Sequence, residues 1–502
     1  MTRKKLPIGI QTFCEIREEG YYYVDKSGIA VRLVNEGKYY FLSRPRRFGK
    51  SLFLDTLKEL FEGNESLFKG LAAEQRWDWS RKFVVIFISF AEGVVHSREV
   101  LNAKITEQLD VNQQALGLCT TQPMLSGRFS ELIRLTRAKV GQRVVVLVDE
   151  YDKPMLDNIT DSGIASDMRD GLRDLYSVIK GQDANLQFAM LTGVSKFSKV
   201  SLFSGLNNLT DITLDETYSD ICGYTDADVD TVFAPELPGL DSELIRSWYN
   251  GYNWLGTSVY NPFGLLQLFR TRQFKPHWFE MGTPDFLINL LGKRQQFTPD
   301  LSRIVASDTL LSTFDVDSIP VEALLFQTGY LTIDSVWYAP GQVEITLKYP
   351  NLEVQASLNV PGPQISRLYK LLMALDFSGL KNLFHTFYAS IANDWYHEMD
   401  NYEGYYVSIF YSYFAALGLN IKLEDPTNFG CIDMTVLFNG HAFLFEFKVV
   451  KVRSRGHALK QIKERNYAQK YKKRGEPIHL IGVEFSKTSR NIVRFEVETL
   501  IF

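Results

Sequence analysis

Short apolar runs alternate with longer amphipathic stretches over about the first 235 residues of the chain. The apolar runs have the length and β-branched content of buried strands, and they lie at 39–43, 83–90, 143–148 and 187–192. The stretches between them carry apolar residues at helical spacing, and they lie at 52–61, 99–109, 130–139 and 168–180. This alternation predicts a mostly parallel sheet covered by helices, so we expect an α/β fold.

The pattern changes twice further along the chain. Residues 236–375 contain turn-rich aromatic segments and weaker signals for helices at 284–291 and 321–328, which predicts a small mixed or mainly helical connecting domain. Residues 376–502 combine two helices, a hairpin at 432–450, a basic helix and two further strands, which predicts a second compact α/β domain. We therefore expect three domains, 1–235, 236–375 and 376–502.

Composition limits the classes of function. The chain has 502 residues, 45% of them hydrophobic and 23% charged, as in ordinary globular proteins with more than one domain. The net charge of −4 excludes a general attraction to nucleic acid, so any such contact must come from a local basic patch. No apolar run approaches the ~18 residues of a membrane span, and the four cysteines show no metal-ligand spacing. We expect a cytoplasmic protein with free thiols.

The segment 39–51 runs from a predicted strand through a loop into a predicted helix, and it ends in the second half of a phosphate-binding loop. Gly49 lets the backbone approach a phosphate closely, and Lys50 can reach the β- and γ-phosphates of ATP. The Ser51 hydroxyl can bind Mg²⁺, while the helix N-terminus faces the anion. The alternative is a basic surface loop that caps a helix.

The first half of this loop departs from the usual pattern, because Arg44 stands where glycine is expected. Arg44, Arg46 and Arg47 could contact phosphate or could simply be solvated. Together with Phe48 they complete the predicted nucleotide-binding loop. No residue can be assigned as an arginine finger from this pattern.

A second apolar strand, at 143–148, is followed by two acids. A buried parallel strand delivers its C-terminal residues to the edge of the sheet where ligands bind. We therefore expect Asp149 to hold Mg²⁺ through water and Glu150 to polarise the attacking water. The alternative is a strand that leads into an acidic turn. A third strand ends at Thr192, which could sense the γ-phosphate or could lie in a plain turn.

Asn439 and Gly440 lie between two apolar runs, which is the strongest short-range signal for a β-hairpin. A two-residue loop sets the register, so the neighbours of the loop face each other and, further along, Asp433 faces Glu446. Two carboxylates directly opposite each other repel. A divalent cation held between them resolves that repulsion, so the sequence predicts a Mg²⁺ site at this pair.

The alternation of side chains sorts the hairpin into two faces. Asp433, Glu446 and Lys448 share one face, where Lys448 could orient or activate a water or stabilise charge developing on a phosphate. The alternative is an exposed hairpin with scattered charges. The other face is entirely apolar and is expected to form the core, and its residues are Ile432, Met434, Val436, Phe443, Phe445, Phe447 and Val449.

A basic stretch follows the hairpin. Residues 448–474 contain eleven Lys or Arg and a single acid, so a nucleic-acid backbone is the expected partner, and a solvated helix face is the alternative. The helix is predicted at 457–473, before Gly475, and Gln461 lies one turn into it. Upstream, Glu403 opens an amphipathic helix and could supply another carboxylate, although an acid at a helix N-terminus needs no further function.

The chain resembles a bacterial family of largely uncharacterised proteins that join an AAA-ATPase-like domain to a PD-(D/E)XK nuclease-like domain. The resemblance covers nearly the whole chain and keeps the order of the motifs, and Arg44 in place of glycine looks normal for the family. The stretches that carry it are 6–11, 22–26, 41–51, 147–152, 191–196, 248–252, 445–448 and 461–471.

The resemblance implies an ASCE-type nucleotide site and a restriction-endonuclease-like core. In the pattern of that superfamily Glu403 matches the first-helix acid and Asp433 the metal-binding acid. Glu446 and Lys448 match the E-x-K pair, and Gln461 matches the position in the following helix. The expected partner is nucleic acid, with DNA favoured over RNA, and a homo-oligomer is left open.

Three functions compete at this point. The leading one is an ATPase coupled to a Mg²⁺-dependent nuclease. The second is a nucleotide-dependent switch whose nuclease-like domain grips nucleic acid without cutting it. The third is an ATPase that remodels a protein partner, and it leaves the basic helix unexplained. Any biological role beyond these would rest on analogy alone.

Overall fold

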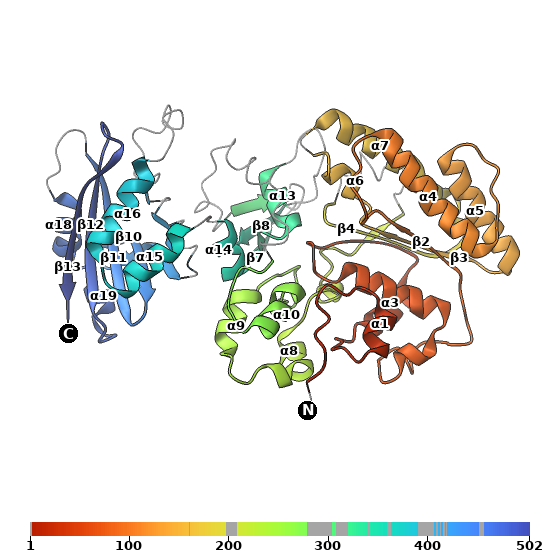
Figure 1. The fold of residues 1–502 in the computed structure, drawn as a ribbon, viewed down its shortest axis with the longest axis horizontal. Coiled ribbons are helices and arrows are strands. Elements are labelled where there is room, and N and C mark those ends of the chain that lie inside the picture. Colours follow the sequence, from red (N-terminus) through yellow and green to blue (C-terminus); the bar gives the residue numbers. More distant parts are fainter. Residues whose placement is uncertain are drawn as a thin grey trace. The chain divides into compact units, whose positions relative to one another are not determined.

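The chain folds into two compact units in the computed structural model (Figure 1). The N-terminal unit comprises Met1–Asn289 and Arg303–Asn351, and the C-terminal unit contains Leu352–Phe502. Both units combine a β-sheet with helices, so the α/β prediction is confirmed. The structure describes residues 3–159, 161–196, 208–278, 304–307, 320–339, 342–358, 363–389, 406–407, 410–411, 413–414, 417, 419–450 and 456–501.

The N-terminal unit is built on a five-stranded parallel sheet with the order β2-β3-β4-β1-β5. Its strands are β1 (Tyr39–Ser43), β2 (Val85–Ser89), β3 (Val144–Asp149), β4 (Leu186–Gly193) and β5 (Thr210–Asp211). The first four match the apolar runs in the sequence. Because β4 lies between β1 and β3, the carboxyl ends of these three strands lie next to one another, with Leu42 beside Thr192.

Helices cover both faces of this sheet. They are α1 (Phe13–Glu18), α2 (Ser27–Glu36), α3 (Lys50–Glu62), α4 (Arg98–Leu116), α5 (Leu125–Val140), α6 (Lys153–Leu156) and α7 (Ser162–Gly181). Figure 1 shows α4, α5 and α7 on one side of the strands and α1 and α3 on the other. The apolar positions at helical spacing point to the sheet, as for Leu54, Leu57 and Leu60 of α3, which are all fully buried.

The N-terminal unit continues into helices and a small antiparallel sheet, β6-β8-β7. These elements are α8 (Asp226–Val232), α9 (Ser242–Tyr249), α10 (Pro262–Thr271), β6 (Ile304–Ser307), α13 (Val321–Thr328), β7 (Thr332–Ala339) and β8 (Gln342–Lys348). The region expected as a connecting domain, 236–375, is divided between the two units. Its described residues up to Asn351 belong to the N-terminal unit, and those from Leu352 onward belong to the C-terminal unit. The helix expected at 284–291 lies outside the described residues.

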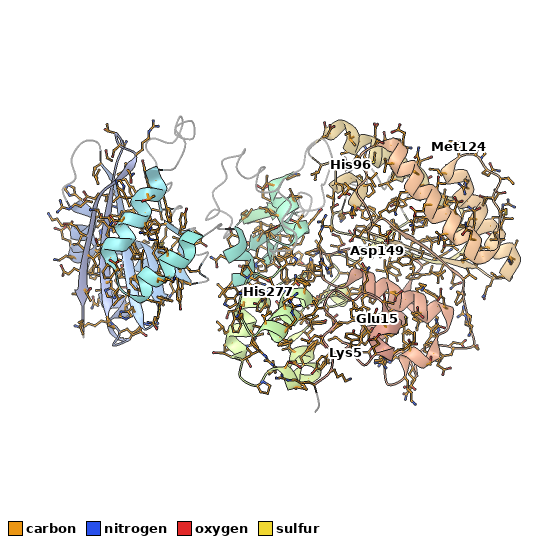
Figure 2. All side chains as sticks on the ribbon, in the orientation of Figure 1. Lys5, Glu15, His96, Met124, Asp149 and His277 are labelled. Atoms are coloured by element: carbon orange, nitrogen blue, oxygen red, sulfur yellow. The ribbon has the colours of Figure 1, made fainter. Side chains whose placement is uncertain are left out.

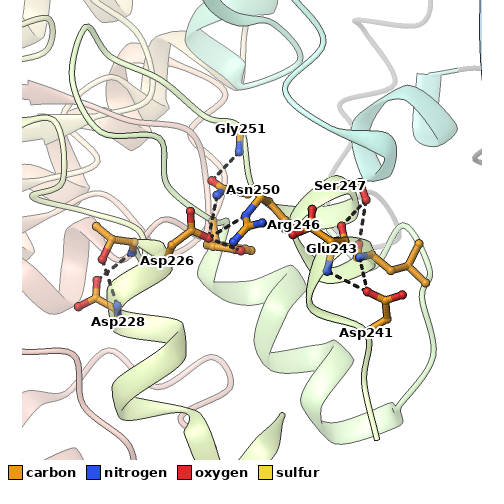
Figure 3. A network of polar contacts seen from close by, with 11 residues as sticks. Asp226, Asp228, Asp241, Glu243, Arg246, Ser247, Asn250 and Gly251 are labelled. Carbon is orange, nitrogen blue, oxygen red and sulfur yellow. Dashed lines mark hydrogen bonds and ion pairs between the residues drawn. The ribbon is translucent and has the colours of Figure 1, made fainter. Parts of the chain in front are cut away.

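Polar contacts explain why the aromatic segment 248–252 joins the N-terminal unit (Figure 3). Asp226, at the start of α8, accepts hydrogen bonds from the Tyr260 hydroxyl at 2.7 Å and from Asn250 at 3.4 Å. Gly251 follows with a φ of 107°, and a Cβ there would overlap the carbonyl group of Pro350. Only glycine fits this close approach of two chain segments.

The C-terminal unit contains a mixed five-stranded sheet with the order β13-β12-β11-β10-β9. Its strands are β9 (Asn420–Thr427), β10 (Gly430–Phe438), β11 (His441–Val450), β12 (Ile478–Ser486) and β13 (Asn491–Leu500), and only β11 and β12 run parallel. The helices are α14 (Leu352–Leu358), α15 (Pro363–Met373), α16 (Phe377–Ala389), α18 (His457–Glu464) and α19 (Gln469–Lys472). The single basic helix expected at 457–473 is thus two short helices, because Asn466 between them adopts a left-handed φ of 47°.

Both faces of this sheet are covered. Phe443, Phe445 and Phe447 pack with α15 and α16 in one apolar cluster, while Leu444 packs with residues of α18 and α19 in a second. The expected position of Ile432 on the first face is wrong, since it packs in the second cluster. Between Ile432 and Met434 the ladder with β9 lacks the pair of Asp433 with Glu424, and Glu424 has a left-handed φ of 44°. Within the part of the chain that the structure describes, every helix is too short or too polar to cross a membrane.

Candidate functional site

The loop between β1 and α3 forms the phosphate-binding part of a candidate nucleotide site. Gly49 precedes α3 with a φ of 94°, a left-handed conformation that favours glycine. The Lys50 ammonium is buried and donates hydrogen bonds to the carbonyl oxygens of Arg44 at 2.9 Å and Pro45 at 3.0 Å. Burial lowers the pKa of Lys50, and the carboxylate of Glu150 opposes that shift. The loop thus curves around a positive charge.

Arg44 fits neither of the expectations for its side chain. It is fully buried, and its guanidinium donates hydrogen bonds to the carbonyl oxygens of Thr213 at 2.8 Å and Tyr218 at 3.2 Å. The same group lies 4.1 Å from the ring centre of Trp254. Arg44 therefore anchors the start of the loop to the chain after β5, and only its main chain faces the Lys50 ammonium.

The next two arginines differ from Arg44, because both line a cavity. The guanidinium of Arg47 lies over the ring of Phe263 at 5.2 Å. The carbonyl oxygen of Arg46 accepts a hydrogen bond of 3.2 Å from the indole N–H of Trp278. These two side chains remain candidates for phosphate contact, as expected.

Phe48 serves the loop through packing. It is buried, and it meets the rings of Tyr252 and Trp254 edge-on at centroid distances of 4.7 Å and 5.4 Å. Its carbonyl oxygen accepts a hydrogen bond from Gly223 at 3.2 Å. The turn-rich aromatic segment that the sequence placed in a separate domain therefore supports the phosphate-binding loop directly.

Two acids at the end of β3, Asp149 and Glu150, lie close enough to Lys50 to interact with its charge. Asp149 ends β3, is buried, and accepts a hydrogen bond of 2.8 Å from the Thr192 hydroxyl. Thr192 is fully buried and is not part of the cavity wall, so in this structure it holds Asp149. Glu150 does line the cavity, and burial raises its pKa while Lys50 opposes the shift. Figure 2 labels Asp149 in the N-terminal unit.

The cavity between these groups has a volume of about 610 Å³, within the range of small-molecule sites. From the expected residues it receives Arg46, Arg47, Phe48, Gly49, Lys50, Ser51 and Glu150. Sequence reasoning missed the rest of the wall, which includes Pro7, Ile10, Pro262, Phe263 and Leu266. The charged loop and this apolar wall suit a ligand with a polyphosphate and a flat apolar group, such as ATP.

The C-terminal unit holds the second candidate site at the hairpin of β10 and β11. The observed register runs from Phe438 opposite His441 to Met434 opposite Phe445, as predicted. Asp433 comes next, and its carboxylate accepts a hydrogen bond of 2.8 Å from the main-chain N–H of Phe447. The Asp433 carboxylate thus replaces a main-chain acceptor at the point where the regular pairing of β10 and β11 ends.

Four residues expected from the sequence meet at this point. Glu446 is fully buried, and its Oε1 accepts hydrogen bonds from the Lys448 ammonium at 3.1 Å and from the Gln461 amide of α18. The Lys448 ammonium also lies 4.0 Å from the carboxylate of Asp433. Glu403, the fifth expected residue, lies outside the described residues.

A main-chain oxygen completes the arrangement. The Lys448 ammonium donates a hydrogen bond of 2.8 Å to the carbonyl oxygen of Phe447. Oxygens of Asp433, Glu446 and Phe447 therefore surround one cation. Among the described residues no group of three or more His, Cys, Asp or Glu could hold a metal, so a metal here would need this carbonyl oxygen. Sequence reasoning missed it, because every residue carries a carbonyl and none signals its use.

Strand β12 places α18 beside the hairpin. Gly482 pairs with Glu446, and a Cβ at Gly482 would lie 2.7 Å from the Cβ of Leu459 in α18. The buried carboxylate of Glu484 accepts hydrogen bonds from the first two main-chain N–H groups of α18, those of His457 and Ala458. These contacts bring the helix close enough for Gln461 to reach Glu446.

The basic stretch is less free than its sequence suggests. Lys463 lies 2.7 Å from Glu498, and Lys460 lies 3.5 Å from Glu464 of the same helix. Lys470 forms an ion pair of 2.5 Å with Asp425, whose side chain is only 2% exposed. Lys470 therefore holds α19 to β9 and is a poor candidate for a nucleic-acid contact. The exposed pairs cost little to break, so their lysines remain available to a phosphate.

Comparison with known proteins separates the same two parts. Residues 7–203 match the model of a family described as "Predicted AAA-ATPase". Residues 401–495 match the model of the PD-(D/E)XK nuclease superfamily. The chain is also 61% identical over 515 residues to an "Uncharacterized protein in vnfD 5'region" of Azotobacter chroococcum mcd 1, and the match covers 100% of both chains.

Proposed function

The chain belongs to the family of proteins that join a predicted AAA-ATPase module to a PD-(D/E)XK nuclease-superfamily module, and from this premise we propose that ATP binding or hydrolysis controls a Mg²⁺-dependent nuclease. The observation that carries the proposal is the convergence of Asp433, Glu446, Lys448 and Gln461 on one point. The substrate is a nucleic-acid backbone, with DNA favoured over RNA.

The oxygens at this point fit a divalent cation. Two carboxylates and one carbonyl already surround the ammonium of Lys448, and hard oxygen ligands are what Mg²⁺ prefers. Asp433, Glu446 and the Phe447 carbonyl would hold the ion. Bound there, it would supply Lewis-acid chemistry and activate a water for attack on the phosphodiester.

The remaining side chains support this chemistry. Lys448 carries a positive charge that can stabilise the negative charge developing on a phosphate. Gln461 donates to Oε1 of Glu446 and so orients that carboxylate. Phe445 and Phe447 are fully buried behind the site, which holds their strand in place.

The N-terminal site is proposed to bind ATP with Mg²⁺. Lys50 and the main chain around Gly49 would hold the phosphates, and Ser51 and Asp149 would hold the ion. Glu150 faces the same cavity, where it would polarise the attacking water. Arg46 and Arg47 would add positive charge beside the phosphates.

The main competitor is a switch whose nuclease-like module grips nucleic acid without cutting it. Such a grip needs positive charge and no carboxylate pair, whereas the two carboxylates here lie beside a single ammonium. The carboxylate pair therefore favours cleavage over a passive grip.

The test is incubation of the purified full chain with plasmid, linear DNA and RNA, each with and without ATP and Mg²⁺. We expect cleavage that requires Mg²⁺ and changes with ATP. Asp433→Asn and Lys50→Ala serve as separate controls for the two sites. Nucleic acid that is bound but stays intact under every condition would support the competitor.

A further inference from the structure

Residues 149–152, which we call the acid turn, carry Glu150. The acid turn is hydrogen-bonded to the end of strand β4 and to the turn that follows it. Asp152, two residues further on, is 1% exposed, and its Oδ2 accepts hydrogen bonds from the main-chain N–H of Ser195 at 2.6 Å and from the Ser195 hydroxyl at 2.5 Å. The N–H of Val194 also points to this carboxylate, at 3.1 Å. Three donors from the turn after β4 thus converge on one side chain.

Tyr151 strengthens the same junction from its main chain and its hydroxyl. Its N–H donates to the carbonyl oxygen of Thr192 at 3.0 Å, and its hydroxyl donates to the carbonyl oxygen of Ser195 at 2.9 Å. Thr192, near the end of β4, thus holds the main chain of Tyr151. Ser195, in the turn after β4, holds its hydroxyl group. The acid turn has little freedom to move relative to β4.

Gly193 makes the close approach possible. A Cβ at this position would lie 2.5 Å from a ring carbon of Tyr151 and would also overlap the carboxylate of Asp152. No side chain larger than hydrogen fits here without moving the turn. Gly193 is therefore required at this position because the acid turn packs directly against it.

The hydrogen bonds of the acid turn have a consequence for the residue that they enclose. Glu150 has a φ of 50°, a left-handed conformation that is costly for a residue with a side chain. Such strain persists only when the surrounding contacts impose it. The contacts on either side are those of Asp149 to Thr192 and of Asp152 to Ser195, and between them the Glu150 side chain lines the cavity.

We propose that Asp152 is a positioning residue for ATP hydrolysis, which binds the acid turn to β4 and so holds Glu150 in the strained conformation that faces the cavity. The inference rests on the proposed ATPase function. Asp152 is buried and is not part of the cavity wall, so it would act through Glu150. The phosphate-binding loop follows β1. Its first residues contact the end of β4 and the turn after it through main-chain oxygens, those of Gly193 and Val194, and not through the Asp152 carboxylate.

These contacts predict that a change at Asp152 lowers the rate of ATP hydrolysis and leaves the affinity for ATP nearly unchanged. Asp152→Ala removes the acceptor for three donors, so the turn should relax and Glu150 should lose its alignment. Small displacements of a reacting group are costly, and we expect kcat for ATP to fall by about tenfold or more. The Kd for ATP and the KM should stay within about twofold of the wild type.

The experiment measures ATP binding by calorimetry and steady-state hydrolysis in the full chain, with thermal unfolding alongside. Asp152→Asn keeps one oxygen that can accept from Ser195 and should recover part of kcat. Gly193→Ala makes its change on β4. The added methyl group should push the acid turn away from β4 and so reproduce the loss of kcat.

Glu236→Gln is the matched control. Glu236 is also a buried carboxylate of the N-terminal unit, where it accepts hydrogen bonds from Tyr22 at 3.1 Å and Arg272 at 3.2 Å. Its replacement should lower the unfolding temperature and leave kcat unchanged. A kcat loss in this control as large as that of Asp152→Ala would reduce the role of Asp152 to general stability.

Two outcomes distinguish a failure of the role of Asp152 from a failure of the proposed ATPase activity. A wild-type chain that binds ATP but never hydrolyses it removes the proposed ATPase and this inference together. Wild-type hydrolysis that Asp152→Ala and Gly193→Ala both leave intact removes the inference alone. Should Asp152→Ala fail to fold, Asp152→Asn and Gly193→Ala decide between the same alternatives.

Discussion

The Asp433 carboxylate accepts a hydrogen bond of 2.8 Å from the main-chain N–H of Phe447 on the neighbouring strand. The bond lies one residue beyond the last regular pair of the hairpin, Met434 with Phe445. It leaves the carboxylate beside Glu446 and Lys448, where the proposed nuclease chemistry requires it. The position of one acid thus depends on where two strands stop pairing.

The first prediction concerns the carboxylate pair. Two carboxylates share one ammonium here, so Glu446→Gln should leave the metal-free protein no less stable, or slightly more so, because a negative charge is removed. The same variant should abolish cleavage and lose the rise in unfolding temperature that Mg²⁺ or Mn²⁺ gives the wild type. Asp433→Asn should behave alike. Cleavage that persists in both variants would rule out this site.

The second prediction concerns the nucleotide. Lys50→Ala removes the main cation of the phosphate-binding loop and should reduce ATP affinity below detection. Glu150→Gln should keep ATP affinity within about twofold and stop hydrolysis, since the loop does not include Glu150. Fluorescence anisotropy with a labelled ATP and a phosphate-release assay check the two effects. Unchanged affinity in Lys50→Ala would contradict the assignment of the loop.

The third prediction concerns the basic stretch. Lys460→Glu together with Lys463→Glu should weaken nucleic-acid binding and lower the slope of log K against log salt by about two, since each phosphate contact contributes roughly one. Filter binding at several salt concentrations measures this slope. Lys104→Glu in the N-terminal unit, which removes ion pairs with Glu92 and Glu107, is the control. A slope equal to that of the control would identify a solvated helix face.

Lys470 should respond differently from these two lysines. Its ion pair of 2.5 Å with Asp425 is formed with a carboxylate that is 2% exposed. Reversal to Glu would leave two carboxylates facing each other at a largely buried position, which costs about 3–5 kcal/mol. Chemical denaturation should show this loss without nucleic acid present. A stability equal to that of the wild type would contradict a structural role for Lys470.

The fourth prediction concerns the glycine under α18. Gly482→Ala places a methyl group against Leu459, so α18 should move away from the sheet and Gln461 should lose contact with Glu446. We expect a loss of about 1–3 kcal/mol in stability and a weaker affinity for Mn²⁺. Gly475→Ala is the control, because it strains a left-handed φ of 69° but meets no neighbouring atom. Equal Mn²⁺ affinity in both variants would count against the role of α18.

The fifth prediction concerns acid stability in the C-terminal unit. Burial, and then the charge of His441, lowers the pKa of His479 from 6.5 to about 4. The unfolded chain takes up a proton below pH 6.5 while the folded chain resists it until about pH 4, so this stability is present above pH 6.5 and is lost as the pH falls toward 4. The loss is at most about 3.5 kcal/mol, since each pKa unit is worth ~1.4 kcal/mol.

His479→Gln should remove this part of the pH dependence of stability. Chemical denaturation at several pH values between about 7 and about 4 measures it, a range that roughly spans the pKa values of the unfolded and the folded chain. His385→Gln is the control, because His385 is exposed. A wild-type slope in His479→Gln would show that other groups cause the acid loss.

Local sequence determined a large part of this protein. Apolar runs located four strands of the N-terminal sheet, because a buried strand needs continuous apolar side chains. The two-residue loop at Asn439 and Gly440 determined the hairpin register, because side chains alternate with a period of two. The same register put Asp433 opposite Glu446, but the regular pairing ends at Met434 and Phe445. The two acids meet instead at the Lys448 ammonium.

Tertiary structure decided the rest, since it depends on contacts between residues that are distant in the chain. Arg44 looked like a phosphate ligand, but a shell of carbonyl oxygens and Trp254 buries it. The segment 248–252 looked like part of another domain, but its Tyr252 packs on Phe48. A residue's type and spacing show which chemistry it can perform. Whether its side chain faces a ligand or a carbonyl depends on which distant segment packs beside it, because burial requires every polar group to find a partner.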